Sequence, residues 1–538
     1  MYIFNFFKDK ARQLRKSLND GNRRHDLSRS NCDLELAKVS ENVCERAQTN
    51  EPVPVEKLNW DSSEDKGNPY NWPQWKKWYV TLTVAMICLC VSIGSSLYVA
   101  GVPDMVIRFG VSQELCISGL SFYLIGLAIG PAVAAPLSEI FGRRFIFFFS
   151  LPISMLFAMG VGLSKNICSI LILRFFCGCF SSPAMAVAGG SISDIWKFQD
   201  IGFAMSMFSL APFLGPILGP IIGGFAVEKK GWQWTTWIYL MVSGIILPFV
   251  LMLPETYKPI ILSKRAERGG IELIKPPKDK DYVKNMATVT LLRPLKMLIV
   301  EPIVLVLAIY ISFVFAVLFG FFEAYPIIFE GVYHMSLGIS GLLFLGVGIG
   351  LMCGAVFFIT IDKMVYNPRN ADGTRGKRDK DGNLILGTPE SKLLCAEVGA
   401  VSLPIALFWL AWTGRTDSVQ WMVPIAAGVP FGFGLFLIFL SVIYYYSMSY
   451  PPTTLASAIA ANNLLRYLLA SAFPLFTVKM YNRLHIEWAT SLLGFIALAM
   501  VPVPFLFRKF GAKLRKKSKF GYAALFKRSP EQKAHEYQ

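Results

Sequence analysis

The sequence lacks the motifs of an ATP-driven pump or a hydrolase. It contains no G-x4-G-K-[ST], which excludes direct drive by ATP through a P-loop, and no G-x-S-x-G to mark a serine nucleophile. The four histidines, His25, His334, His485 and His535, lie far apart, and none of the ten cysteines pairs at a zinc spacing. We therefore expect no enzyme, no metal and no cofactor.

Charged residues are also scarce, at 17% of the 538 residues against 54% hydrophobic. A membrane span needs about 20 apolar residues, and runs of that length are bounded by charged loops along most of the chain. The pattern predicts an all-α polytopic membrane protein with twelve transmembrane helices and no soluble domain of any size. The predicted spans are 77–102, 115–138, 145–163, 168–192, 201–226, 234–253, 301–326, 338–361, 392–412, 419–446, 453–478 and 487–507.

The distribution of Lys and Arg predicts the orientation of these spans. If both tails are cytosolic, most of the 53 Lys and Arg lie inside, as the positive-inside rule requires. The net charge of +17 then reflects topology, and it indicates no nucleic-acid partner because the basic residues are spread over tails and inner loops. The outer loops would hold only Arg108, Lys165, Lys229, Lys230, Arg415, Lys479 and Arg483.

The fifth span holds four glycines and three prolines between Ser206 and Gly224. A helix survives such breakers in a membrane, where neighbouring helices satisfy the freed backbone groups. Gly215, Gly219 and Gly223 fall four residues apart, so one stripe of the helix has no side chains and another helix can approach to backbone distance. An ordinary small-residue contact between helices is the alternative interpretation.

The whole string resembles the fifth-span signature G-x8-G-x3-G-P-x2-G-G of the twelve-span drug:proton antiporters in the major facilitator superfamily. Ser206 stands where the first glycine of that signature should be. The L-Y-x4-P-D-M of residues 97–105 is typical of the same branch, and the resemblance to fungal drug and polyamine transporters covers roughly residues 60 to 512. The residues of the antiporter motif are Gly215, Pro216, Gly219, Pro220, Gly223 and Gly224.

This resemblance implies the major facilitator fold, in which two six-helix halves rock about a midplane site. It also implies proton-coupled export of drugs, polyamines or other small organic cations, by a monomer in the plasma membrane. Uptake of a polyamine or cation, an uncoupled facilitator, a non-transporting ligand sensor and a vacuolar location stay open. The expected parts are a cytosolic tail at 1–76, a half at 77–253, a central loop at 254–300, a second half at 301–508 and a cytosolic tail at 509–538.

After the second span, residues 135–144 resemble the superfamily signature G-x3-D-[RK]-x-G-x-[RK]-[RK]. A tight cytosolic turn of this kind can pair its charges with helix ends in one conformation and release them in another. Asp194, at the inner end of the fourth span, is the expected partner, and a plain topology anchor is the alternative. The residues of this predicted conformational switch are Glu139, Gly142, Arg143, Arg144 and Asp194.

Arg174 lies in apolar surroundings where a guanidinium is costly unless it faces the bundle interior or water. The family's proton-coupling motif R-x-x-Q-G matches at Arg174 and Gly178, although Cys177 replaces the glutamine. Snorkelling of Arg174 to the interface is the alternative. Because arginine does not exchange protons at ordinary pH, its expected role is to tune a carboxylate or hold a water chain.

Glu323 lies among aromatic residues in the seventh span, where a carboxylate must be hydrated, paired or protonated. We expect it to carry a proton or to bind a cationic substrate, with an interfacial structural role as the alternative. Asn462 and Asn463 in the eleventh span are expected to contact substrate, and helix-to-helix hydrogen bonding explains them equally well.

Overall fold

The computed structural model describes residues 53–54, 58–62, 64–197, 200–269, 273–274, 292–366, 368 and 387–522. The predicted N-terminal tail up to residue 52, much of the central loop and the end of the C-terminal tail lie outside these residues. The chain forms two compact units, one of residues 1–65 with 262–276 and one of residues 66–261 with 277–538.

In the described residues of the smaller unit, a short strand pair and an ion-pair cluster connect its segments. Strands β1 (Val53–Pro54) and β2 (Leu273–Ile274) run parallel. Arg265, near the end of α10 (Lys258–Arg268), donates to the carboxylates of Asp61 and Asp65 at 3.1 Å and 3.0 Å.

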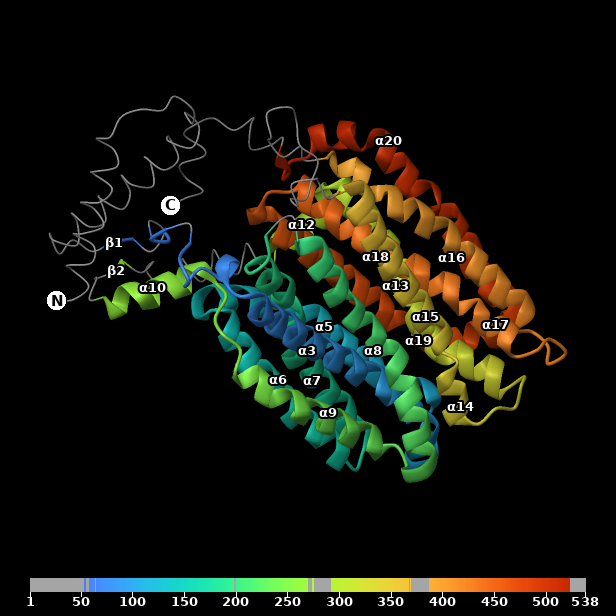
Figure 1. Ribbon diagram of the computed structural model, residues 1–538. Helices are drawn as coiled ribbons and strands as arrows, with labels where there is room; N and C mark the ends of the chain where they lie inside the picture. Colours follow the sequence, from blue (N-terminus) through green and yellow to red (C-terminus); the bar gives the residue numbers. More distant parts are fainter. Residues whose placement is uncertain are drawn as a thin grey trace, which may run out of the picture. The chain divides into compact units, whose positions relative to one another are not determined.

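The larger unit is a bundle of long helices (Figure 1). Short helices α4, α12, α14 and α17 lie beside the long ones, and α20 follows the last span. Its helices are α3 (Gln74–Ala100), α4 (Val102–Phe109), α5 (Gln113–Phe141), α6 (Arg143–Leu163), α7 (Ile167–Ser193), α8 (Ile201–Lys230), α9 (Gln233–Leu251), α12 (Arg293–Val300), α13 (Pro302–Tyr325), α14 (Leu337–Leu342), α15 (Leu345–Ile361), α16 (Leu394–Thr413), α17 (Met422–Ala426), α18 (Gly428–Ser449), α19 (Pro452–Met500) and α20 (Pro502–Lys517).

Short turns extend several of these helices. A π-helical turn, Pro326–Glu330, continues α13, and another, Asp362–Tyr366, continues α15. A 3-10 turn at Pro389–Leu393 leads into α16, and one at Pro69–Asn71 precedes α3.

Eleven segments of the described chain are long and apolar enough to cross a membrane. The number differs from twelve because the last segment, Thr454–Lys517, is 64 residues long and includes both the eleventh and the twelfth predicted spans. His485 divides it with φ 58° and ψ 169°, which are not helical values. The twelve predicted spans are therefore all present as helix.

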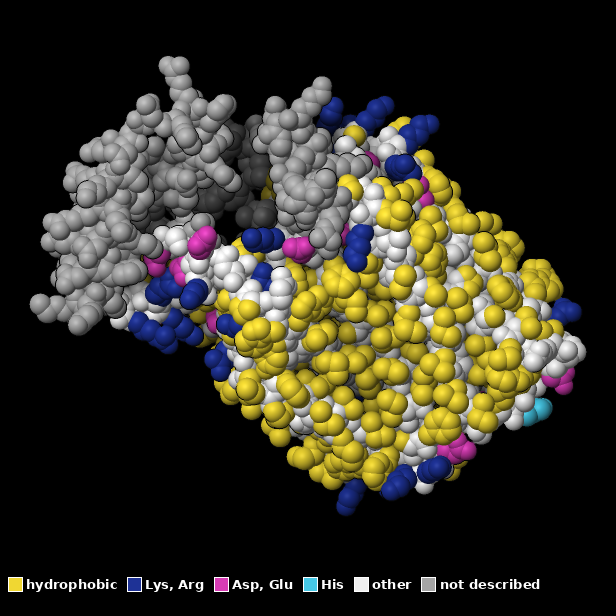
Figure 2. All heavy atoms as spheres, in the orientation of Figure 1, with side chains coloured by type: hydrophobic (Ala, Val, Ile, Leu, Met, Phe, Trp, Pro, Cys, Tyr) yellow, Lys and Arg dark blue, Asp and Glu magenta, His cyan; other side chains and the backbone are white. Residues whose placement is uncertain are grey.

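Large apolar side chains cover the face of the bundle that Figure 2 shows, and Lys and Arg gather at its margins. Soluble monomers rarely expose such a continuous apolar surface, whereas a lipid-facing surface is apolar. Ile245, Val356, Leu156 and Trp488, for example, are 70%, 65%, 64% and 55% exposed. The chain is a multi-pass membrane protein.

Candidate functional site

The glycine stripe of α8 packs directly on α3. A Cβ added at Gly215 would lie 2.2 Å from the Cβ of Ser92, and one added at Gly219 would lie 1.9 Å from Oγ of Ser96. The Ser96 hydroxyl donates to the Gly215 carbonyl at 3.0 Å. The predicted approach of a second helix to backbone distance is confirmed, and the partner is α3.

The neighbouring face of α8 meets α14, in the second predicted half. A Cβ at Gly224 would lie 2.7 Å from the Leu337 carbonyl oxygen, and one at Gly341 would lie 2.3 Å from that of Pro220. The antiporter motif therefore presents glycine to both neighbours, one in its own half and one across the interface.

A second contact between the halves joins α5 to α19. The Ser121 hydroxyl donates to the Ser471 carbonyl at 2.6 Å, and Lys479 pairs with Glu114 at 3.2 Å. The halves also touch at the opposite end, where a Cβ at Gly202 would lie 2.9 Å from a carboxylate oxygen of Asp362. The interface is thus in contact at both ends.

Glu323 lines a cavity of about 70 Å³ between the halves, at the end predicted to face outside. This volume holds several water molecules and is too small for a drug-sized ligand. Glu323 is 5% exposed, and the amide nitrogen of Gln113 donates to its carboxylate at 2.9 Å. The lining residues come from α3, α4, α5, α8, α13 and α14, and include Pro220 and Gly224 of the antiporter motif.

The sequence analysis missed Glu330, a second carboxylate in the same cavity. Glu330 ends the π-helical turn that continues α13, seven residues after Glu323, and its buried Oε1 has no hydrogen-bond partner. The spacing of seven residues on one helix could have revealed it, because such residues share a face. No Lys or Arg is among the residues that line this cavity.

Arg174 points into the interior of the first half and does not snorkel. It is 7% exposed, and its guanidinium donates to the carbonyls of Gly94, Ser95 and Gly119 at 2.7, 3.3 and 3.3 Å. Its Cζ lies 4.4 Å from each of the ring centroids of Tyr98 and Tyr123.

The surroundings of Arg174 differ from the expectation. Among the described residues, no carboxylate forms an ion pair with it, and Glu323 has a different polar partner. A cavity of about 20 Å³ beside Arg174 and Cys177 has room for about one water molecule. Arg174 therefore joins α3 to α5 through their backbones rather than tuning a carboxylate directly.

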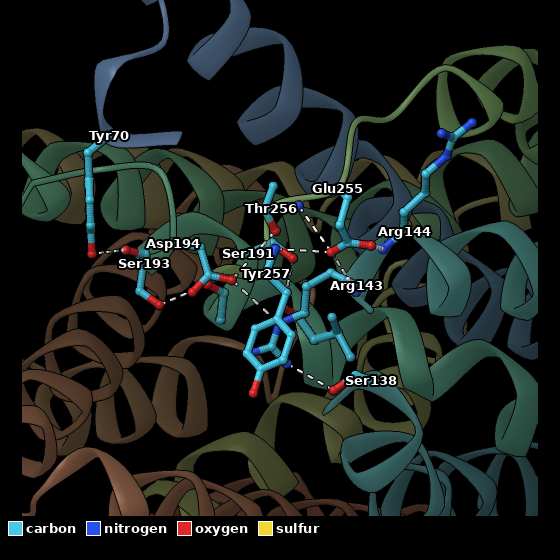
Figure 3. Close-up of polar contacts among 12 residues, drawn as sticks. Tyr70, Ser138, Arg143, Arg144, Ser191, Ser193, Asp194, Glu255, Thr256 and Tyr257 are labelled. Atoms are coloured by element: carbon cyan, nitrogen blue, oxygen red, sulfur yellow. Dashed lines mark hydrogen bonds and ion pairs between the residues drawn. The ribbon is translucent and has the colours of Figure 1, made fainter. Parts of the chain in front are cut away.

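The predicted partners Arg143 and Asp194 meet at the inner end of the first half (Figure 3). The Nε of Arg143 lies 3.5 Å from Asp194, and its Nη1 donates to Ser138 at 2.9 Å. Tyr257 covers the guanidinium at 4.9 Å, and the Thr256 hydroxyl donates to Asp194 at 3.5 Å. Burial raises the pKa of the Asp194 carboxyl to about 6, against the opposing effect of Arg143.

Glu255 completes this cluster, and the sequence analysis gave it no role. Its carboxylate accepts from the backbone N–H groups of Arg143 and Arg144 at 2.9 and 3.2 Å (Figure 3). Those N–H groups begin α6 and have no partner within the helix, so a carboxylate is favourable there. Gly142 has φ 95°, and a Cβ on it would lie 2.3 Å from Glu255.

The other members of the predicted switch lie at the edge of the cluster. The Arg144 side chain is exposed and donates to the Leu251 carbonyl at 3.3 Å. Glu139 is exposed near the end of α5. Only Arg143 and Asp194 of the predicted charges form an ion pair here.

Of Asn462 and Asn463 in α19, only Asn462 is fully buried. Asn462 is 0% exposed and neither amide atom has a hydrogen-bond partner, whereas Asn463 is half-buried. Helix-to-helix hydrogen bonding therefore does not account for Asn462.

Comparison with known proteins agrees with the helix bundle. The profile of the Major Facilitator Superfamily matches residues 84–474. The sequence is 51% identical over 497 residues to Polyamine transporter 4 of Saccharomyces cerevisiae, covering 89% of this chain and 75% of the relative. It is 39% identical over 464 residues to the major facilitator superfamily multidrug transporter mdrA of Aspergillus fumigatus, covering 85% and 74%.

A solved structure shares the fold. The proton:xylose symporter XylE, bound to 6-bromo-6-deoxy-D-glucose, matches with a TM-score of 0.59 at 17% identity and covers 82% of this chain and 96% of that one. At this identity the match supports the arrangement of the helices and no particular substrate.

Proposed function

This chain belongs to the major facilitator superfamily and is a secondary transporter of small molecules; we propose that it exports organic cations in exchange for protons. Names of its relatives include polyamine transporter, multidrug transporter and efflux pump, which support a cationic or drug-like substrate and outward transport. We place the transporter in the plasma membrane as a monomer of two six-helix halves.

The pair of carboxylates in the cavity between the halves is the main evidence for a cationic substrate. Glu323 and Glu330 line it together with Gln113, without a basic residue to neutralise them. Two carboxylates in a confined apolar space favour bound protons or bound ammonium groups. Their spacing along one helix suits a substrate with two separated cationic centres.

Coupling then follows from competition for Glu323. A proton that arrives from outside neutralises this carboxylate and displaces the cation, and the cation can bind again only after the proton has left on the inside. Gln113 holds Glu323 across the interface, so the charge of Glu323 also affects how tightly α5 is held to α13. Arg174 fixes α5 to α3 from within the first half, and this is the role that we propose for it in proton coupling.

At the inner end, we propose that Arg143, Asp194 and Glu255 form a conformational switch. Their contacts join the start of α6 to the end of α7 and to the segment after α9. The charges favour the arrangement in which these helix ends meet, and the switch requires a second state in which the ends separate within the first half.

The test is transport by the purified chain in vesicles with an imposed pH gradient. The probes are 1,4-diaminobutane, 1-aminobutane and 1-butanol, which share a carbon chain and differ in charge. We expect the pH gradient to drive transport of both amines. Glu323→Gln should lower the transport rate of both amines about tenfold or more, and Glu330→Gln should lower only that of the diamine to this degree. Glu487→Gln, on α19 outside the cavity lining, is the matched control.

Four results would contradict the proposal. Equal effects of both substitutions on the amines and on 1-butanol would assign the carboxylates a structural role. Amine movement that ignores the pH gradient would indicate a facilitator. Amine accumulation on the less acidic side, in the direction of proton flow, would indicate uptake by a symporter. Binding of amines without any transport would indicate a ligand sensor.

A further inference from the structure

Arg466 lies in an aromatic cluster deep in the bundle, away from the cavity of Glu323. It is 6% exposed, and its Cζ lies 4.7 Å from the ring centroids of Phe315 and Tyr467 and 5.2 Å from that of Phe439. These rings belong to α13, α19 and α18. A guanidinium in such a position is costly unless its donors are satisfied.

Several polar atoms of this cluster have no partner. Arg466 donates through Nη2 to the Tyr467 hydroxyl at 3.1 Å, but its buried Nε has no acceptor. Among the described residues, Arg466 forms no ion pair. Asn462, one turn earlier on the same face of α19, has both amide atoms buried and unpartnered. Buried polar groups are normally hydrogen-bonded, so these atoms indicate a missing ligand.

The first half covers this cluster. Phe213 of α8 packs on Phe439 with ring centroids 4.8 Å apart, and the Tyr467 hydroxyl lies 3.6 Å from Sδ of Met185 in α7. The cluster thus lies where the two halves meet, and parting of the halves would expose it.

We propose that Arg466 and Asn462 form a subsite for an acidic group of a transported compound, while the surrounding rings hold its apolar body. The inference rests on the proposed transport function and extends its substrates to organic acids and to compounds that carry both charges. The Nε of Arg466 and the amide nitrogen of Asn462 supply two donors for a carboxylate, and the amide oxygen accepts from a hydroxyl.

An acidic ligand fits this subsite better than a cation does. The aromatic rings alone could bind an ammonium group, but the Arg466 charge already occupies their faces and would repel it. The unpartnered Nε needs an acceptor, which a cation lacks. The aromatic face continues along α13 towards Glu323. The ring centroid of Phe319 lies 5.0 Å from that of Phe315 and 5.2 Å from that of Phe322, the residue before Glu323. A compound with both charges would find a cationic and an anionic group along one aromatic face.

The experiment compares three probes of one size, 4-phenylbutyrate, 4-phenylbutanol and 4-phenylbutylamine, in binding to the purified full chain at neutral pH. We expect the acid to bind about tenfold more tightly than the alcohol. Arg466→Gln should remove this preference, leave the alcohol within about twofold and strengthen the amine, and Asn462→Leu should weaken the acid alone. Arg108→Gln, at an exposed arginine of α4, is the matched control.

Binding of the acid no tighter than the alcohol would overturn the inference, and so would equal weakening of all three probes by Arg466→Gln. Arg466→Lys guards against a folding defect, because it retains the charge and should retain part of the acid preference. If amines are transported in a Glu323-dependent way while the acid does not bind, the inference fails and the proposed function stands. If the acid binds through Arg466 while amine transport ignores Glu323, the cationic assignment fails and the inference stands.

Discussion

Two charged side chains in this bundle bind backbone groups of neighbouring helices. Arg174 donates hydrogen bonds to three backbone carbonyls of α3 and α5. Glu255 accepts from the backbone N–H groups of the first two residues of α6. In an apolar surrounding such bonds fix the position of a helix end, because losing one leaves a buried polar group unpaired. Substitutions at these residues therefore report on the position of the helices as well as on charge.

Replacing Arg174 separates its geometry from its charge. Arg174→Lys keeps the charge but loses the planar fork that reaches three carbonyls, so we expect gradient-driven transport to fall about tenfold, and further in Arg174→Ala. Vesicle transport across a range of pH gradients measures this, with the protein level in the membrane as a check. Arg108→Lys, at an exposed arginine, should match wild type, and an unchanged pH dependence in Arg174→Ala would disprove a coupling role.

The pKa of Asp194 predicts a pH effect of definite sign. Burial raises this pKa to about 6, above the ordinary value of about 3.9, so the folded chain binds a proton more readily than the unfolded chain. The charged form of Asp194 therefore costs stability, and this cost grows as pH rises from about 4 to 6 and is complete above 6. Asp194→Asn should raise the melting temperature relative to wild type at pH 7.5.

This difference should vanish below pH 4, where both side chains are neutral. Melting of the purified chain in detergent between pH 4 and 8 measures it, and Asp417→Asn, at an exposed carboxylate between α16 and α17, is the control. A variant that melts below wild type at pH 7.5 would show that the ion pair with Arg143 outweighs the cost of burial.

Among the elements, α8 contributes most to the interface, because its bare faces meet two helices at once. The sequence predicted the glycine stripe of α8 and its use for close approach. It could not predict that α3 is the partner, since any helix with small residues fits such a stripe, and Ser92, Ser96 and Ala100 supply them here at the same spacing. The ends of the helices were predictable to within a few residues from apolar runs and charged loops.

A substitution in the stripe tests its function. In Gly219→Val the new side chain meets Ser96 and the backbone of Leu97 within 3 Å, so α3 and α8 must separate. We expect near-normal abundance in the membrane and loss of coupled transport, either complete or with a proton leak. Transport and substrate-free proton leak in vesicles distinguish the two.

Gly244→Val in α9 is the matched control, because no atom lies within 4 Å of a Cβ added there. Normal exchange by Gly219→Val would show that the stripe is an ordinary packing surface.

At the scale of the whole molecule, the halves are in contact at both ends of their interface, and the cavity between them at Glu323 measures about 70 Å³. The sequence predicted Glu323 as a site residue from its apolar setting, and the structure adds Glu330 and Gln113, which come together only through the fold. Arg466 is recognisable in the sequence as a polar group of the eleventh span, but it was given no site role, because a single arginine in a span says nothing about the rings around it. The residue bounds of the two halves remain a prediction, since the bundle forms one compact unit.

Alternating access predicts that the contact between α5 and α19 opens during transport. Cysteines at Ser121 and Ser471, where the Ser121 hydroxyl donates to the Ser471 carbonyl at 2.6 Å, should form a disulfide under mild oxidation and then stop transport. Reduction should restore it, and substrate with a pH gradient should lower the yield of the disulfide. Each single cysteine variant is the control, and full transport by the oxidised double variant would show that this contact does not open.

The C-terminal segment after α20 is bound to the beginning of α13. Glu301, which is 1% exposed, accepts from the backbone N–H groups of Lys519 and Phe520 at 2.6 and 3.1 Å and from the Tyr450 hydroxyl at 3.2 Å. During synthesis Glu301 is made 218 residues before Lys519. Until the C-terminal segment is made, the Glu301 carboxylate therefore lacks these two backbone N–H donors. A chain interrupted before residue 519 would lack both backbone donors, and of the three contacts Glu301 would keep the one with the Tyr450 hydroxyl.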